Sequence, residues 1–458
     1  LMSLQKAGYK TIMINCNPET VSTDYDVSDQ LYFEELSLEK ILDIYEFQQP
    51  MGVVVSMGGQ TPNNLSLKLH NACLHIFCTS PMQIDNAESR HKFSQILDSL
   101  EIDQPEWKEL TDIDSAKEFA ERVGYPVLVR PSYVLSGAAM SISYSKDDLE
   151  AFLKKAVDLN KDYPVVISKF ITKAREIELD AVANDGELFC YAISEHLENA
   201  GVHSGDATLI FPAQKTYMET MRRIKRIAKE VAKALQITGP FNMQLIAKDN
   251  DIKVIECNLR ASRSFPFVSK VLKINFIDIA TRLMMGEAVP KLSRSSFDLD
   301  YVGVKASQFS FARLKGSDPI TRVEMSSTGE VACLGDDLNE AFLKSAISTG
   351  FNVEPRSVLL SIGSLDKKTA FLEEAKILQN MGIKIYATIG TGAFLKENNI
   401  AAEVLEWETE NNQSNVMSHL SDKKIDLVIG IPSNTEKAGL SNGYLARRKA
   451  IDQNISLI

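Results

Sequence analysis

The chain has 458 residues, of which 44% are hydrophobic and 24% are charged, and its formal net charge is −11. This length exceeds one ordinary core and predicts roughly two to four domains. The acidic balance argues against a protein that coats nucleic acid or a membrane surface, although a local cluster of arginines can still bind an anionic substrate. No apolar run approaches the ~20 residues that span a bilayer, and the N-terminus resembles neither a signal nor a transit peptide.

The six cysteines are scattered along the chain, and no CxxC pair occurs. This spacing is typical of reduced, mostly buried thiols in an intracellular protein. We therefore expect a cytoplasmic protein without disulfides, with the mitochondrion as the alternative compartment.

Residues 1–85 alternate short apolar runs with helical stretches. Strands are predicted at "KTIMINC", "GVVVSMGG" and "LHIFCTS", and helices at "SLEKILDIYEFQQ" and "SLKLHNA". Strand–helix alternation of this kind predicts a parallel sheet. The chain begins on what reads as the end of a helix and stops on a strand, "NISLI", so we expect the natural protein to continue in at least one direction.

Residues 86–286 are predicted to form an α+β unit in which strands dominate. Helices at "NAESRHKFSQILDSL" and "DIDSAKEFAERVG" precede the strands "VLVR" and "MSISYS", which a small-residue loop joins. The strands "PVVISKF", "EIELDAVAND" and "ELFCYAISEH" follow, then a long charged helix, the hairpin "FNMQLIAKDNDIKVIECN" and the helix "FIDIATRLMMG".

The last part of the chain separates into a connector and a small α/β domain. Residues 287–354 read as a connector with some structure of its own. Alternation then returns in "SVLLSIG", "KKTAFLEEAKILQNMG", "IKIYATIGTGAF" and "IDLVIGIP". The expected fold is therefore multidomain α/β and α+β, with a doubly wound domain over 355–458 that is cut short at its end.

The stretch "VIECNLR" carries an unusual set of polar residues for an apparent core strand. Because side chains alternate across a strand, Glu256, Asn258 and Arg260 are expected to point to one face. The opposite face is expected to pack in the core and comprises Ile255, Cys257 and Leu259.

The hairpin brings further polar residues to the same face. If pairing centres on Asn250 in the turn "KDND", Gln244 lies opposite Glu256 and Asn242 lies opposite Asn258. Directly opposed side chains are close enough to share a ligand.

This set of residue types suits a magnesium–phosphate site. Carboxylate and amide oxygens are ligands for Mg²⁺, which usually binds through one or two carboxylates together with substrate phosphates. Arg260 and Arg263 stand beside them and are suited to hold an anion. The alternative for each single residue is an exposed polar sheet face with surface ion pairs.

Two loops are further candidate ligand-binding segments. "NAGVHSGDAT" contains Gly201 and Gly205, which permit close backbone approach, and His203 and Ser204, which can bond a sugar or a phosphate; a solvated turn explains this loop equally well by itself. "RPSYVLSGAAM" starts with Arg130 and suits a flap over phosphates. No G-x-x-x-x-G-K-[ST] occurs, which excludes a Walker-type P-loop, and no zinc pattern is present.

The motifs "NCNPETVSTDYD", "GGQTP", "VRPSYVLSG", "AGVHSGDA" and "IECNLRASRSFPFVSK" occur in this order. In sequence and spacing they resemble the C-terminal synthetase half of the carbamoyl phosphate synthase large subunit. The resemblance covers essentially the whole chain. It implies a truncated pre-ATP-grasp domain (1–85), an ATP-grasp domain (86–286), a connector (287–354) and a methylglyoxal-synthase-like regulatory domain (355–458).

The family's activity in this half is phosphorylation of carbamate by ATP, so the resemblance implies ATP and Mg²⁺ or Mn²⁺ as cofactors. It implies catalytic roles for Arg260 and Arg263, which would orient carbamate and the transferring phosphoryl group. Metal binding is implied for Gln244, Glu256 and Asn258. Nucleotide binding is implied for Arg90, Arg130, Lys169, Ile171, Glu176, Gly201, Val202, His203, Ser204, Gln244 and Glu256.

The regulatory domain offers a candidate effector site. Thr388 and Thr391 lie at a strand-to-helix turn, which is a natural anion site. With Trp407 they match relatives that N-acetylglutamate activates, but Gly430 and Ser433 stand where such relatives carry asparagines. Acetylglutamate control is therefore doubtful, and nucleotide control or none is equally open.

The resemblance implies a glutaminase subunit or domain and the N-terminal synthetase half as partners, carbamate as substrate, and neither nucleic acid nor a membrane. The product would feed arginine or pyrimidine synthesis. Two rival hypotheses are another ATP-grasp ligase, such as a carboxylase subunit, and a regulatory nucleotide-binding module without its own chemistry. The first would not share both "VRPSYVLSG" and "AGVHSGDA", and the intact metal set argues against the second.

Overall fold

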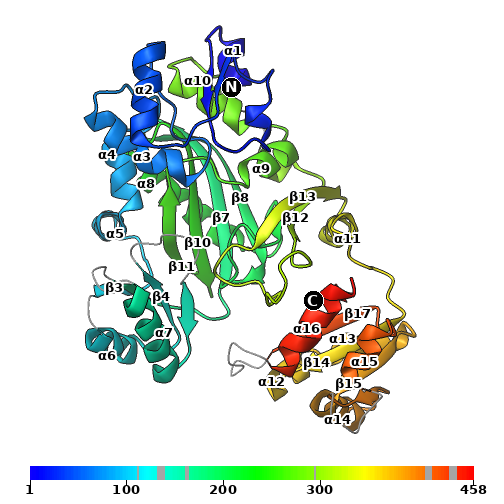
Figure 1. Cartoon of the computed structure of the whole chain (residues 1–458). Helices are drawn as coiled ribbons and strands as arrows, with labels where there is room; N and C mark the ends of the chain where they lie inside the picture. The colour runs from blue at the N-terminus through cyan, green and yellow to red at the C-terminus, as the bar shows by residue number, and fades with distance from the viewer. Residues whose placement is uncertain (111–112, 132–139, 160–164, 293–294, 408–414, 433–440) are drawn as a thin grey trace. The chain divides into compact units, whose positions relative to one another are not determined.

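A computed structural model of the chain describes residues 1–110, 113–131, 140–159, 165–292, 295–407, 415–432 and 441–458 (Figure 1). The chain divides into two units, and each is described by itself. The first comprises Leu1–Lys305 with Leu334–Leu338, and the second comprises Ala306–Cys333 with Asn339–Ile458. Within the described ranges, no helix has both the length and the apolar character needed to cross a bilayer.

The N-terminal segment contains less sheet than the sequence predicts. β1 (Ile12–Ile14) pairs in parallel with β2 (Gln30–Tyr32), which was not predicted. The expected strands "GVVVSMGG" and "LHIFCTS" are wrong in extent, because they meet only in one parallel bridge between Val53 and Ile76. Their apolar character reflects burial beside helices, since Val55 is 1% exposed in the same core as residues of α3 and α4. The helices of this segment are α1 (Met2–Lys6), α2 (Leu38–Gln48), α3 (Gln60–Asn71) and α4 (Pro81–Glu88).

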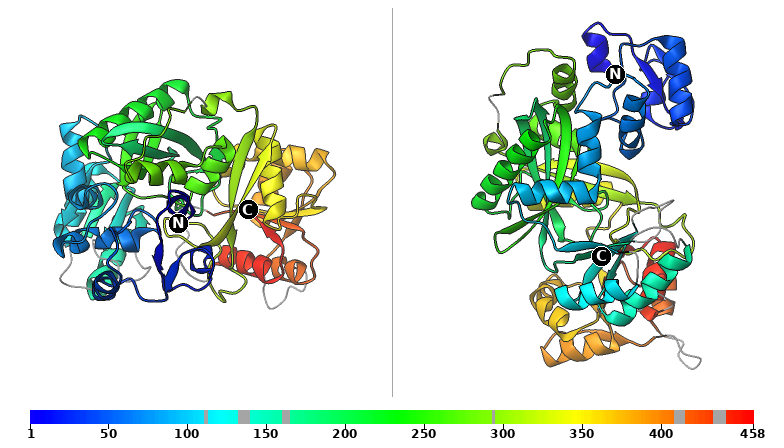
Figure 2. Two further views of the ribbon diagram at one scale, coloured as in Figure 1. Left: turned by 90° about the horizontal axis from the view of Figure 1, so that it is seen from above. Right: turned by 90° about the vertical axis from the view of Figure 1, so that its left-hand side faces the viewer.

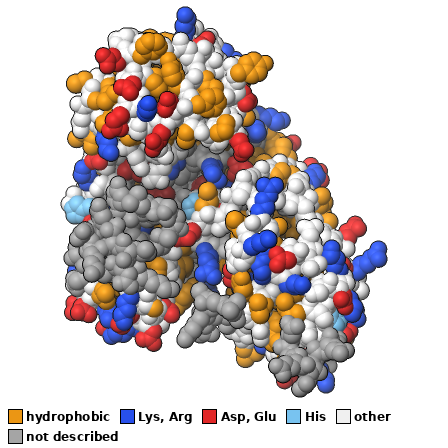
Figure 3. Space-filling model, in the orientation of Figure 1, with side chains coloured by type: hydrophobic (Ala, Val, Ile, Leu, Met, Phe, Trp, Pro, Cys, Tyr) orange, Lys and Arg blue, Asp and Glu red, His pale blue; other side chains and the backbone are white. Residues whose placement is uncertain are grey.

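The outer surface of this segment carries many apolar side chains (Figure 3). Tyr25, Phe47 and Met51 are 92%, 78% and 67% exposed. The segment also contributes to the interior of the first unit, where the Ser56 carbonyl accepts a hydrogen bond of 2.9 Å from the Ala261 amide. It therefore supports the chain that follows the predicted metal strand.

A four-stranded antiparallel sheet follows α5 (Arg90–Ser99), which begins directly after a break at Ser89. Its strands β4 and β5 confirm the predicted pair around residue 130, and most of the loop between them lies outside the described residues. Apolar residues of α6 and α7 pack against one face of the sheet. The order is β3 (Trp107–Leu110), β6 (Val165–Lys169), β4 (Val127–Pro131) and β5 (Ser141–Ser143), and the helices are α6 (Ile113–Val123) and α7 (Lys146–Leu159).

A seven-stranded sheet has the order β11-β10-β7-β8-β9-β12-β13, and most of its strands belong to the first unit. One face is covered by α8 (Met218–Ala234), whose apolar residues join the largest core cluster. On the other face α9 (Phe265–Leu272) and α10 (Phe276–Met284) pack around Val182. Figure 2 shows from two further directions the helices that lie along this sheet. The strands are β7 (Arg175–Asn184), β8 (Glu187–Asn199), β9 (Leu209–Phe211), β10 (Gly239–Lys248), β11 (Asp251–Asn258), β12 (Val302–Phe309) and β13 (Ser327–Gly335).

The β10–β11 hairpin confirms the predicted pairs and corrects their cause. Asp249 and Asn250 form a two-residue turn with φ of 50° and 66°, so that Lys248 pairs with Asp251. A bulge beside Gln244 then shifts the register by one residue. The predicted pairs at the site therefore hold only because the bulge offsets the position of the turn.

The bulge also changes the packing face of β11. The extra residue is Ile255, which is half-buried and does not join the core, so its predicted place beside Cys257 is wrong. Val254 packs in the core instead, and it is 0% exposed. Cys257 and Leu259 are buried as predicted, at 2% and 1% exposure, and all six cysteines are free thiols.

The second unit contains a five-stranded sheet in the order β16-β15-β14-β17-β18 in which every neighbouring pair is parallel. Separate apolar clusters cover its two faces, as a doubly wound domain requires. The strands are β14 (Ser357–Ile362), β15 (Lys384–Thr388), β16 (Glu403–Leu405), β17 (Leu427–Ile431) and β18 (Ser456–Leu457). The helices are α11 (Leu338–Ser348), α12 (Leu365–Ala370), α13 (Leu372–Asn380), α14 (Ile389–Glu397), α15 (Val416–Ser421) and α16 (Asn442–Asp452).

Candidate active site

The predicted metal-binding residues meet on one face of the β10–β11 hairpin. Gln244 pairs with Glu256, and Asn242 pairs with Asn258. The Gln244 amide nitrogen donates to Ser204 Oγ at 2.8 Å, and the Asn258 amide nitrogen donates to Glu256 Oε1 at 2.9 Å. Both amides thus use their nitrogens within the protein and present their carbonyl oxygens as acceptors. Asn258 Oδ1 takes one long contact of 3.4 Å from Arg260 and keeps a second lone pair for a hard cation.

This donor set differs from a site built of clustered acids or histidines. In the described part of the chain, no group of three or more His, Cys, Asp or Glu side chains is placed to hold a metal ion. The set on the hairpin has one carboxylate and two amides, which fits Mg²⁺ bound together with nucleotide phosphates better than a cage of protein carboxylates.

The contacts of Arg260 are those expected of an arginine whose hydrogen bonds are completed by an anionic ligand. Its terminal nitrogens make only long contacts of 3.4 Å, with Asn258 Oδ1 and the Ala261 carbonyl. Its Nε is buried and has no hydrogen-bond partner among the described residues. A buried donor without a partner is costly, so a phosphate or carboxylate beside Glu256 would complete this site.

Arg90 and Arg130 are brought together although they come from different elements. Arg90, the first residue of α5, donates to the Ile255 carbonyl and lies 5.5 Å from the centre of the Trp107 ring. Burial and the nearby Arg130 charge lower the pKa of Arg90 to about 10. Two neighbouring guanidinium groups form a favourable place for a polyphosphate.

The loop after β8 supplies neutral hydrogen-bond donors. His203 Nδ1 accepts from the Gly205 amide at 3.0 Å, and burial lowers the pKa of His203. The ring is therefore neutral near pH 7 with its proton on Nε2, which can donate to a ligand. Gly201 has a φ of 122°, and a Cβ at this position would lie 3.1 Å from the Phe170 ring, so the backbone favours glycine directly before Val202 and His203.

Two further predicted nucleotide residues, Ile171 and Lys169, differ in their surroundings. Ile171 lines a cavity of about 260 Å³ with Ala174 and Ile246, and charged side chains of the β10–β11 hairpin complete its lining: Lys248, Asp249, Asp251 and Lys253. Lys169 is occupied elsewhere, because its ammonium group donates to the Gly124 and Tyr125 carbonyls at 2.7 and 3.2 Å. Its nucleotide contact stays a prediction that requires this ammonium group to move.

Glu176 gives a prediction of pH dependence. Burial, followed by the charges of Glu178 and Glu256, raises the pKa of Glu176 to about 7, against an ordinary value of 4.5. As pH rises from the ordinary pKa of 4.5 to the raised pKa of about 7, this glutamate ionises in the unfolded chain before it ionises in the folded one, so it lowers the free energy of unfolding. Glutamine at this position does not ionise. The free energy of unfolding of Glu176→Gln, relative to that of the wild type, should therefore rise by up to about 3 kcal/mol between about pH 5 and pH 8. Urea denaturation at both pH values checks this prediction, and it is contradicted if the free energies of unfolding of the two proteins change in parallel with pH.

Glu176→Gln also tests the nucleotide contact that is predicted for Glu176. If the side chain contacts the nucleotide, the variant should bind MgADP about tenfold more weakly than the wild type.

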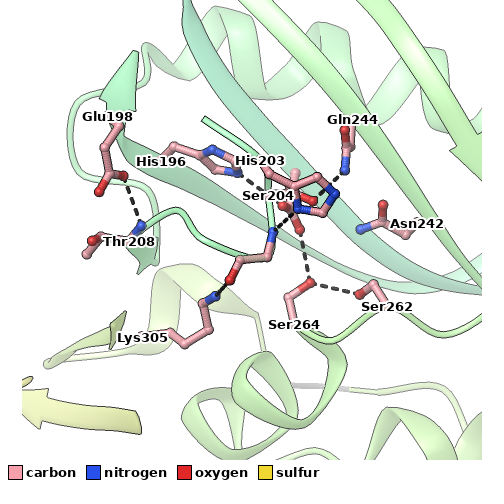
Figure 4. A network of polar contacts seen from close by, with 12 residues as sticks. His196, Glu198, His203, Ser204, Thr208, Asn242, Gln244, Ser262, Ser264 and Lys305 are labelled. Carbon is pink, nitrogen blue, oxygen red and sulfur yellow. Dashed lines mark hydrogen bonds and ion pairs between the residues drawn. The ribbon is translucent and has the colours of Figure 1, made fainter. Parts of the chain in front are cut away.

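Sequence reasoning missed a buried polar network beside the site (Figure 4). Glu178 and Asp180 follow Glu176 on the same face of β7 and contact His196, Asn242, Ser262 and Ser264. Burial, then the Glu178 charge, raises the pKa of Asp180 to about 7. The alternation in "EIELD" was a sufficient signal, because it places three acids on one side of a strand, as in "VIECNLR".

The candidate effector residues occupy the carboxyl end of the second unit's sheet. Thr388 donates to Thr391 Oγ1 at 3.3 Å, while the Thr391 hydroxyl also bonds both the amide and the carbonyl of Ile362. Thr391 therefore joins β14 to the first turn of α14. Trp407 packs against the core cluster on one face of the sheet.

Sequence models of known families match most of the chain. The carbamoyl phosphate synthase preATP-grasp domain matches residues 1–86, the ATP-binding domain of the carbamoyl-phosphate synthase L chain matches 89–292, and an MGS-like domain matches 370–458. Curated relatives align over the whole chain. They include multifunctional protein URA2 of Saccharomyces cerevisiae at 53% identity, multifunctional protein CAD of Squalus acanthias at 49%, and mitochondrial carbamoyl-phosphate synthase [ammonia] of Rattus norvegicus at 48%. The chain spans only 21%, 21% and 31% of their respective lengths.

Solved structures of low sequence identity share the fold. Biotin carboxylase of Campylobacter jejuni matches with a TM-score of 0.59 at 17% identity, covering 75% of this chain and 86% of that one. N5-carboxyaminoimidazole ribonucleotide synthetase of Thermotoga maritima matches with a TM-score of 0.55 at 17% identity, covering 76% and 94%. Two domain models of carbamoyl phosphate synthase adjoin over residues 1–292, and relatives about half identical align with the whole of this chain over a part of their own length. On these findings the chain belongs to the carbamoyl phosphate synthase large-chain family.

Proposed function

We propose that the chain catalyses the transfer of a phosphoryl group from ATP to carbamate, giving carbamoyl phosphate and ADP. The observation that carries this proposal is the Gln244–Glu256–Asn258 set beside Arg260, whose buried Nε has no hydrogen-bond partner among the described residues. In the reaction a carbamate oxygen attacks the γ-phosphorus of ATP, and the bond from that phosphorus to the bridging oxygen of ADP breaks. No covalent protein intermediate is required.

The residues of the first unit divide this work by position and charge. Arg90 and Arg130 neutralise the phosphates, and the neutral His203 donates from Nε2. Arg260 and Arg263 orient carbamate and the transferring group. Positioning and charge neutralisation of this kind account for most of the catalysis of phosphoryl transfer.

Gln244, Glu256 and Asn258 would hold Mg²⁺, and the availability of two amide oxygens beside a carboxylate fits that ion. When bound, the ion would offset the charge of the phosphates. Mn²⁺ is a possible substitute, because it takes the same oxygen ligands.

The length of the relatives suggests which partners this chain works with. They are named multifunctional proteins or carbamoyl-phosphate synthases, and the chain matches a minor part of each. We therefore propose that carbamate is supplied by another synthetase region of the same protein, with ammonia from a glutaminase. The product would serve pyrimidine or arginine synthesis.

The reverse reaction tests the proposal on this chain alone. With carbamoyl phosphate and MgADP, the chain should form ATP. A folded chain that binds MgADP but forms no ATP would favour a regulatory nucleotide-binding module, and ATP-dependent activation of a different carboxylate would favour another ATP-grasp ligase.

We further propose that the second unit binds an anionic effector at the carboxyl end of its sheet. Lys368 donates to the Gly390 carbonyl at 2.9 Å, beside the Thr388 turn, and Lys367 donates to the Pro432 carbonyl at 2.6 Å, after the end of β17. Nucleoside triphosphates should change the rate of ATP formation, and Lys367→Ala/Lys368→Ala should weaken that effect about tenfold or more. An unchanged response in the double variant would contradict this assignment. A response to N-acetylglutamate alone would show that the anionic effector is a dicarboxylate and not a nucleotide.

A further inference from the structure

Two carboxylates that the proposed chemistry does not use are buried on the central strand of the site. Glu178 and Asp180 lie two residues apart on one face of β7 and are 3% and 0% exposed. A buried carboxylate is costly unless hydrogen bonds satisfy it. The partners of these two groups therefore indicate what they hold in place.

Each carboxylate accepts a hydrogen bond from a serine hydroxyl in the segment that follows β11, the strand of Glu256 and Asn258. Ser262 Oγ donates to Asp180 Oδ1 at 2.6 Å, and Ser264 Oγ donates to Glu178 Oε2 at 3.0 Å. The two serine hydroxyls lie 2.8 Å from each other. Both ends of this short segment are thus bonded to the same strand. Figure 4 shows the Ser264 end of the segment and its contact with Ser262.

The carboxylates have other partners that keep them fixed without the serines. The Asn242 amide donates to Asp180 Oδ1 at 2.8 Å, and His196 Nε2 donates to Glu178 Oε1 at 3.0 Å. Asn242 is also the cross-strand neighbour of Asn258. The two acids consequently connect the metal-binding hairpin to the segment that follows it.

The residue between the two serines is Arg263. Its side chain is exposed, whereas Ser264 is 3% exposed. Ser264 occupies the N-cap of α9, yet its hydroxyl makes no cap hydrogen bond and donates to Glu178 instead. Since serine at this position ordinarily caps the helix, its use on a carboxylate indicates that the position of the segment matters.

We propose that Glu178 and Asp180 are positioning residues, which hold the Arg263 guanidinium at the transferring phosphoryl group through the hydroxyls of Ser262 and Ser264. This inference rests on the proposed function of Arg263. It predicts that the serines act only through that arginine. A role limited to folding would not produce this dependence.

The experiment compares Ser262→Ala/Ser264→Ala, Arg263→Ala and the triple variant, all in the full chain. Two quantities are measured: the rate of ATP formation from carbamoyl phosphate and MgADP, and the binding of inorganic phosphate to the MgADP complex by calorimetry. The serine double variant should lose about 30-fold in rate, with the KM for carbamoyl phosphate raised and the Kd for MgADP unchanged. In the Arg263→Ala background the same two changes should cost less than about twofold.

Two further variants separate positioning from folding. Ser264→Thr keeps the hydroxyl and should stay within about threefold of the wild type. Ser357→Ala removes a buried serine hydroxyl that lies 3.2 Å from Asp426 in the second unit, and it should leave the rate unchanged.

Each outcome decides the inference. A serine double variant with wild-type rate and phosphate binding overturns it, and so does a triple variant whose losses multiply. If the wild type forms no ATP but binds phosphate in a way that depends on both Arg263 and the serines, the positioning role stands and the proposed function fails. If the wild type forms no ATP and its MgADP complex binds no phosphate, both are overturned.

Discussion

Glu256→Gln is expected to reduce ATP formation from carbamoyl phosphate and MgADP by about 1,000-fold or more. Glu256 is the only carboxylate among the three proposed metal ligands, and it lies opposite Gln244 in the hairpin. It also accepts a hydrogen bond from the Asn258 amide nitrogen. The amide of glutamine keeps the size of the side chain but removes its charge. The bound cation would thus lose its one charged protein ligand, while the sheet itself should stay intact.

Measurements besides turnover locate the cause of this loss. Urea denaturation should give a free energy of unfolding within about 1 kcal/mol of the wild type, and the affinity for MgADP should fall more than that for free ADP. The matched control is Glu187→Gln, the same change at the exposed end of β8, which should leave the rate unchanged. Wild-type activity in Glu256→Gln would show that Glu256 is not a metal ligand.

Arg260→Ala is expected to lower the rate by about 1,000-fold, in the range known for arginines that stabilise a transferring phosphoryl group. The physical reason is the buried Nε, which has no hydrogen-bond partner within the described part of the chain, so that a bound anion would complete the hydrogen bonds of the guanidinium. Arg260→Lys keeps the charge but cannot bind an anion with two parallel donors, so it should recover only about tenfold of the loss.

The comparison for this variant is an arginine in an ordinary ion pair. Arg282 bonds Glu287 at 2.9 Å and is half-exposed, so Arg282→Ala should change stability slightly and the rate very little. Full activity in Arg260→Lys would show that charge alone suffices, which contradicts a bidentate role.

The metal face could be predicted from the sequence because alternation separates Glu256 and Asn258 from Cys257. The short polar turn locates the hairpin, but Gln244 faces Glu256 only because a bulge shifts the register that the two-residue turn sets. The bulge at Ile255 could not be predicted, because its cause lies in distant segments. Arg90 bonds the Ile255 carbonyl, and the Val254 amide donates to the Asp103 carbonyl at 2.9 Å.

The buried acids show a different limit of the sequence. Their alternation on β7 is visible, but burial depends on which residues cover them. Ser262 and Ser264 reach Asp180 and Glu178 across more than 80 residues of chain. In the same way, the run around Val53 looks like a strand because it is apolar, yet only one bridge forms. Long-range partners, which local patterns do not record, decide these cases.

The most direct test of the central claim follows phosphorus in the reaction of the chain with MgADP and carbamoyl phosphate. Phosphorus NMR distinguishes carbamoyl phosphate, inorganic phosphate and the γ-phosphate of ATP. If the chain transfers the phosphoryl group between carbamate and ADP, the carbamoyl phosphate signal decreases as the γ-phosphate signal grows in equal amount, and neither changes with Glu256→Gln. Release of inorganic phosphate without ATP, or no change in a folded chain that binds MgADP, would contradict it.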